Sequence, residues 1–107
     1  MNFTSFLQDK RLTVLLSGEI DHHTAREIMG AITSKIDVYL PRRCVLDLGA
    51  VTFMDSSGIA IVIHSLRSMR ELGGELALIN VPPQPLKVLQ AAGIQRLVPV
   101  DRERSPA

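Results

Sequence analysis

Two adjacent hydroxyl side chains, Ser56 and Ser57, lie where the sequence changes from a strand pattern to a helix pattern. Residues 44–48 are mostly apolar and typical of a buried strand, whereas apolar residues at helical spacing follow from position 59 onward. Backbone N–H groups at a helix start have no partner within the helix, and the helix dipole places roughly half a positive charge there. A phosphate is stabilised at such a place, so these residues suit phosphorylation of a serine hydroxyl.

The same residues are also ordinary helix caps. Asp and Ser are common N-cap residues, and Asp55-Ser56-Ser57 before an apolar run could serve only to begin the helix. A second hydroxyl and the following Gly58 are more than one cap needs. The local pattern alone leaves both interpretations open.

Elements that could position these residues are predicted along the whole chain. Strand-type residues at 2–8 and 11–17 flank Asp9-Lys10 and predict a hairpin. A helical pattern then runs from Ala25 to Tyr39, where Pro41 stops it, and its start can be capped by Asp21 or by a Thr24–Glu27 capping box. A strand at 45–48 and a loop at 49–55 lead into a helix from Ser57 to about Leu72, which Gly73-Gly74 ends.

The last third of the chain adds smaller elements. Residues 75–80 predict another buried strand, Pro82-Pro83 a turn, residues 86–93 a third helix and residues 94–100 an edge strand. Residues 101–107 form a polar tail that we expect to fray. The order predicts one α/β domain over residues 1–100, with a mixed, mostly parallel sheet of four or five strands and three or four helices.

Parallel strands make a shared surface from distant residues. If the strand before Gly18 and the strand ending at Leu48 are parallel, their C-terminal ends lie on the same rim of the sheet. Asp21, His22 and Ser56 would then face one surface, although more than thirty residues separate them in the sequence.

Composition limits the classes of function. A chain of 107 residues with 46% hydrophobic content, no Trp, one Tyr and three Phe suits one domain with an aliphatic core. The formal net charge is +1 and the basic residues are scattered, with Lys10-Arg11 and Arg42-Arg43 as the adjacent pairs, so nothing attracts nucleic acid.

Cysteine usage and hydropathy indicate where the protein acts. Cys44 is the single cysteine, so an intramolecular disulfide is impossible and a reducing cytoplasm is the natural setting. The longest wholly apolar run, residues 59–63, is far shorter than the roughly 20 residues that span a bilayer, and residues 1–10 lack a signal-peptide core. We expect a soluble cytoplasmic protein without direct nucleic-acid or membrane contact.

Several enzyme chemistries lack their motifs. Neither serine has Gly two positions before it, as a hydrolase elbow requires, and no feature joins His22, His23 or His64 into a triad. Adjacent histidines on a helix point about 100° apart, so a metal site is not expected. No glycine-rich nucleotide loop is present, and we therefore expect a kinase substrate rather than an enzyme, with no cofactor of its own.

Three segments together resemble a known family. Residues 53–58 (Phe-Met-Asp-Ser-Ser-Gly), 18–25 (Gly-Glu-Ile-Asp-His-His-Thr-Ala) and 72–75 (Leu-Gly-Gly-Glu) are similar to the anti-sigma-factor antagonists, whose fold is the STAS domain. The resemblance covers about Leu12 to Val98, and the Asp-His-His-Thr-Ala segment is most similar to the sporulation branch that releases the first forespore-specific sigma factor.

The resemblance implies a phosphorylation switch. In this family the anti-sigma factor is a serine kinase that uses ATP to modify its own antagonist, and a metal-dependent serine phosphatase reverses the modification. By position in the motif, Ser56 is the phosphorylated residue. Together with the shared rim that parallel strands would form, the resemblance leads us to expect partner binding by Asp21, His22, Asp55, Ser56, Ser57 and Gly58.

Two alternatives remain from the sequence. One is a regulator of another branch, such as general stress signalling, with the same mechanism and different partners. The other is a soluble adaptor domain of a transport complex, which co-purification with a membrane complex would reveal.

Overall fold

The computed structural model describes residues 2–102, and the rest of the predicted tail, residues 103–107, lies outside the described residues. Within that range the chain forms a five-stranded sheet, three α-helices and one short 3-10 helix. Strands follow the order β1-β2-β3-β4-β5; β1 is antiparallel to β2, and the other neighbours are parallel. The predicted mixed, mostly parallel α/β domain is confirmed. The elements are β1 (Phe3–Gln8), β2 (Arg11–Ile20), α1 (His22–Tyr39), β3 (Arg43–Met54), α2 (Ser57–Glu71), β4 (Glu75–Val81), α3 (Pro83–Ala91), η1 (Ile94–Arg96) and β5 (Val100–Arg102).

The opening hairpin turns as its sequence predicts. β1 and β2 pair in register up to Gln8 opposite Arg11, which leaves Asp9 and Lys10 as a two-residue loop. Both residues have positive φ, 51° and 63°, as a type I′ turn requires. The hairpin adds an antiparallel edge strand to an otherwise parallel sheet.

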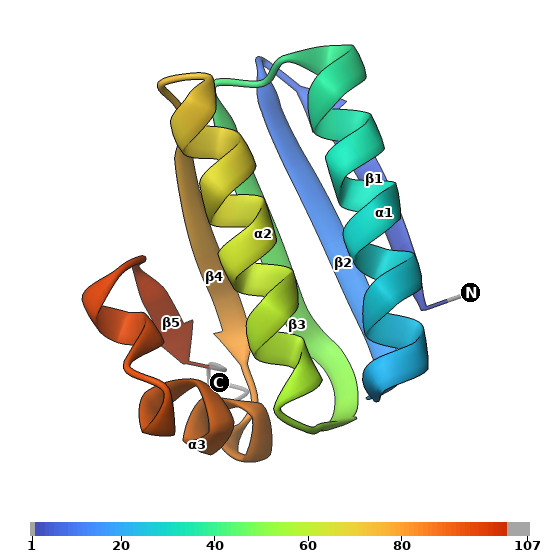
Figure 1. Cartoon of the computed structure of the whole chain (residues 1–107), viewed down its shortest axis with the longest axis vertical. Coiled ribbons are helices and arrows are strands. Elements are labelled where there is room, and N and C mark those ends of the chain that lie inside the picture. The colour runs from blue at the N-terminus through green and yellow to red at the C-terminus, as the bar shows by residue number, and fades with distance from the viewer. Residues whose placement is uncertain (1, 103–107) are drawn as a thin grey trace, which may run out of the picture.

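Helices α1 and α2 lie side by side over one face of the sheet (Figure 1). Each faces the sheet with a stripe of aliphatic side chains, and none of the aromatic side chains in the described range is fully buried. The core is therefore aliphatic, as the composition predicts. Its largest fully buried side chains are Leu12, Ile20, Ile28, Ile32, Ile36, Leu46, Leu48, Met54, Ile61, Met69, Leu78 and Leu89.

The prediction of a loop at 49–55 is wrong for most of its length. β3 continues to Met54, and β2 continues beyond residue 17 to Ile20, so the two strands stay paired to their ends. Two irregularities in the β2–β3 register allow this, because they shift the pairing without breaking it. Burial of Val51 and Met54 in the core holds the extended strand against the helices.

The C-terminal region also differs from the expected elements. Pro83 begins α3 instead of belonging to a turn, consistent with the preference of proline for the first helical position. The predicted strand at 94–100 is instead the 3-10 helix η1 followed by the short strand β5. Gly93, with φ of 74°, turns the chain so that Ile94 and Val98 reach the core.

Cys44 lies near the start of β3 and is fully buried as a free thiol. Removal from water disfavours the thiolate, which raises the pKa of Cys44 to about 12. It acts as a small core residue. None of the helices in residues 2–102 is long and apolar enough to cross a membrane.

Candidate functional site

The motif segments at residues 18–25 and 53–58 meet at one rim of the sheet, at the lower end in Figure 1. Ile20 pairs with Met54 at the C-terminal ends of β2 and β3, and the Asp55 N–H donates a hydrogen bond to the Ile20 carbonyl at 3.1 Å. Asp21 follows Ile20 directly, and Ser56 follows Asp55. The fold thus brings together the segments that carry Asp21, His22 and Ser56.

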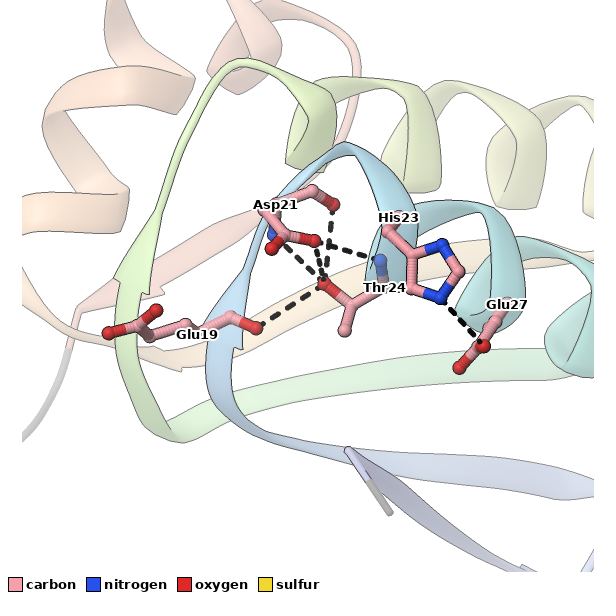
Figure 2. Close-up of polar contacts among 5 residues, drawn as sticks. All are labelled: Glu19, Asp21, His23, Thr24 and Glu27. Atoms are coloured by element: carbon pink, nitrogen blue, oxygen red, sulfur yellow. Dashed lines mark hydrogen bonds and ion pairs between the residues drawn. The ribbon is translucent and has the colours of Figure 1, made fainter.

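Helix α1 begins in a complete capping box formed by Asp21 and Thr24 (Figure 2). The Thr24 N–H donates to Asp21 Oδ1, and the Asp21 N–H donates to Thr24 Oγ1, both at 2.9 Å. The Thr24 hydroxyl also donates to Asp21 Oδ1, at 2.8 Å. Its bond and above all the bond from the Thr24 backbone N–H stabilise the carboxylate, so the pKa of Asp21 lies below its usual value. Asp21 is therefore an exposed, ionised carboxylate at neutral pH.

The Thr24–Glu27 capping box is not formed, because Thr24 occupies the third position of the Asp21 box. Glu27 instead lies 3.4 Å from His23 Nε2 through its Oε1, and both side chains are exposed. His22 is the first residue of α1 and is also exposed.

Helix α2 begins differently. Ser56 is its N-cap residue, yet the Ser56 side chain makes no capping hydrogen bond and is exposed. Asp55 takes over this role, because its Oδ1 accepts the Ser57 N–H at 2.8 Å and its carbonyl accepts the Gly58 N–H at 3.1 Å. Ser57 is half-buried inside the first turn.

Gly58 lies buried below the serines, where α2 approaches the end of β3. A Cβ atom at this position would collide with the Met54 side chain, which is itself 1% exposed. The missing side chain therefore allows close packing of the helix on Met54. Of the predicted partner-binding residues, Gly58 is the one that is buried.

Sequence reasoning missed Gln84, on α3. The Met54 N–H donates to Gln84 Oε1 at 2.8 Å, and Gln84 Nε2 donates to the Met54 carbonyl at 2.7 Å. A single glutamine after two prolines carries no signal of this pairing, since it depends on where α3 packs. Two exposed residues of the motif segments, Glu19 and Phe53, were not predicted as site residues; they pair across β2 and β3 directly before Ile20 and Met54.

Comparison with known proteins identifies the fold and the family. The sequence model of the STAS domain matches residues 7–107. The chain belongs to the STAS-domain family. An anti-sigma F factor antagonist of Paenibacillus polymyxa is 33% identical over 89 residues, which cover 83% of this chain and 76% of the relative. The resemblance found in the sequence is confirmed.

Solved STAS-domain structures include both states of one antagonist. The unphosphorylated form of the anti-sigma factor antagonist SpoIIAA matches with a TM-score of 0.81 and 26% identity, covering 92% of this chain and 86% of that one. The phosphorylated form of SpoIIAA, a Bacillus cell fate determinant, matches with a TM-score of 0.72 and 26% identity, over 92% and 89% of the two chains.

Proposed function

We propose that this protein is an anti-sigma factor antagonist whose binding is switched off by phosphorylation of Ser56. One observation carries the proposal: the Ser56 hydroxyl is exposed at a helix start and free of a capping bond, because Asp55 does the capping. The hydroxyl can therefore be modified without loss of a structural hydrogen bond. The similarity to anti-sigma F factor antagonists supports the same function.

In the unmodified state, the surface around Asp21, His22 and Ser56 docks on an anti-sigma factor that is also a serine kinase, and the sigma factor is released. The Ser56 Oγ then attacks the γ-phosphorus of ATP held by the kinase. ADP leaves, and the hydroxyl proton passes to a base of the kinase. The chain itself contributes a binding surface and the acceptor oxygen.

Phosphate would weaken the complex by charge. It adds about 1.5 to 2 negative charges next to the Asp55 carboxylate and on the rim that carries ionised Asp21. Repulsion and desolvation of that charge in an interface lower affinity. A serine phosphatase would restore the binding form, and the similarity to anti-sigma F factor antagonists favours sporulation as the setting.

The test combines the purified chain, the candidate anti-sigma kinase encoded beside it and ATP, with the phosphate located by mass spectrometry. We expect one phosphate on Ser56, none on a Ser56→Ala variant that still binds the kinase, and an unchanged amount on Ser57→Ala. Loss of the phosphate in Ser57→Ala would instead move the modification to Ser57. Reaction with a stress-signalling kinase alone would keep the mechanism and change the branch.

A further inference from the structure

Strands β3 and β4 separate before β3 ends. Their pairing stops at Asp47 opposite Ile79, and Asn80 then adopts a left-handed conformation with φ of 54°. The Asp47 carboxylate links the two chains where they separate. It accepts hydrogen bonds from the Gly49 backbone N–H at 2.9 Å and from the Asn80 side-chain N–H at 3.1 Å. Beyond this point, β3 has no paired strand on its β4 side among the described residues.

The Gln84 side chain replaces the missing strand at Met54. The primary amide of Gln84 carries a C=O acceptor and an NH2 group, and one N–H lies on the same side as the C=O, so Gln84 offers both an acceptor and a donor to the Met54 backbone. The pair of bonds at 2.8 and 2.7 Å therefore occupies the N–H and C=O of Met54, seven residues beyond the last β3–β4 pair. Both residues are shielded from solvent, Met54 fully and Gln84 in part.

Met54 is the last residue of β3 and lies two positions before Ser56. On the β2 side, this segment is held by the Asp55 N–H bond to Ile20. On the opposite side, it is held by Gln84 from α3. The segment that leads to Ser56 is thus fixed from both edges, and only one of those edges is a strand.

We infer that Gln84 is a positioning residue for Ser56: its amide fixes the end of β3 so that the free hydroxyl is presented in one orientation to the kinase. The inference rests on the proposed function. Phosphoryl transfer needs the attacking oxygen close to and in line with the γ-phosphorus, and a misplacement of about 1 Å can cost about 100-fold in rate. Loss of one restraint of two leaves the segment attached but mobile, so we expect a decrease in kcat/KM of about tenfold.

The decisive variant is Gln84→Met, which keeps the length and bulk of the side chain and removes both hydrogen bonds. Gln90→Met is the matched control, because Gln90 is exposed on the same helix. Ile36→Val is a second control that loosens the core within α1, far along the sequence from the Ser56 segment. Two quantities are measured: amide hydrogen exchange at Met54 in the free chain, and kcat/KM for Ser56 phosphorylation by the kinase.

Faster exchange at Met54 together with a tenfold lower kcat/KM in Gln84→Met, and wild-type kcat/KM in both controls, is the expected result. Unchanged exchange, wild-type kcat/KM in Gln84→Met or an equal loss in Ile36→Val would each overturn the inference. A wild-type chain that accepts no phosphate would refute the proposed function itself, and the positioning role would fall with it. Wild-type phosphorylation with an unaffected Gln84→Met would refute the positioning role alone.

Discussion

Helices α1 and α2 begin at the same rim of the sheet, yet their first turns use their polar side chains in opposite ways. At α1, the N-cap side chain of Asp21 is bound to Thr24 in a closed capping box. At α2, the N-cap side chain of Ser56 makes no capping hydrogen bond, and the residue before it supplies the cap. A helix start can thus be capped and still leave one hydroxyl without a capping bond. The Asp21 side chain is needed for the structure, whereas the Ser56 hydroxyl is a candidate for modification.

The comparison also explains why two acidic residues share this rim. Asp21 and Asp55 each accept a backbone N–H from a helix start, a geometry in which a carboxylate is stabilised. Both carboxylates therefore already stabilise helix starts in the free protein, before any partner binds. A third negative group on Ser56 would be added to an already acidic surface.

The close packing beneath α2 is the strongest test of how its start is built. Gly58→Ala should destabilise the protein by about 1–3 kcal/mol, because the new methyl group overlaps the buried Met54 side chain. Denaturant unfolding measures this change. Gly30→Ala is the matched control, since nothing lies within 4 Å of a Cβ at Gly30, and it should not be destabilising. Wild-type stability in Gly58→Ala would mean that Met54 moves aside freely.

At α1, the capping role of Asp21 can be separated from its charge. Asp21→Ala should lower the melting temperature by about 3–8 °C, because the Thr24 N–H loses its acceptor. Asp21→Asn keeps a good cap and should melt close to the wild type, while its affinity for the kinase and its rate of Ser56 phosphorylation both fall. Calorimetry and a binding titration give the two quantities. Unchanged binding in a folded Asp21→Asn variant would leave Asp21 as a helix cap alone.

At α2, a carboxylate can stand in for the phosphate. Ser56→Asp should stabilise the helix by roughly 0.3–1 kcal/mol, since an acidic group near a helix N-terminus is favourable. Binding to the kinase should nevertheless weaken. Thermal unfolding and affinity are measured on the same sample, with Ser56→Asn as the uncharged control. A melting temperature that collapses with the affinity would show that the switch works by unfolding.

The smallest expected effect is a pH dependence from the α1 cap. The pKa of Asp21 lies below its usual 3.8 in the folded chain, so its capping contribution is fully present above pH 3.8 and is lost as pH falls through the folded-state pKa. The unfolding free energy of the wild type should therefore approach that of Asp21→Ala as the solution is acidified below pH 3.8. A constant difference between them would assign the cap to groups other than this carboxylate.

The elements that were predicted correctly are those specified by residues close together in the sequence. Asp9-Lys10 specifies a two-residue turn, and the apolar stripe from Ala25 to Tyr39 specifies α1. The extension of β3 to Met54 was missed, because it depends on pairing with β2 across an irregular register rather than on alternation within residues 49–54. The choice between two capping boxes at α1 depended on where the helix starts, which Asp21 decides.

The candidate site was predictable in part for the same reason. Asp55 and Ser56 belong to one continuous segment, and the parallel topology predicts that Asp21 lies on the same rim. The role of Gln84 could not be predicted from the sequence, since its hydrogen bonds to Met54 span 30 residues and depend on the packing of α3. Contacts of this kind produce neither a periodic pattern nor a local motif in the sequence, so they cannot be predicted from it.

The lone thiol in β3 offers an independent view of the whole domain. Cys44 has no exposed surface, and its high pKa leaves almost no thiolate at neutral pH, so a thiol reagent cannot react with it in the folded chain. Reaction must wait for an opening that exposes the centre of the sheet. The labelling rate of Cys44 therefore reports the rate of that opening. Comparing this rate between the unmodified and the phosphorylated chain would show how much phosphorylation changes the stability of the sheet.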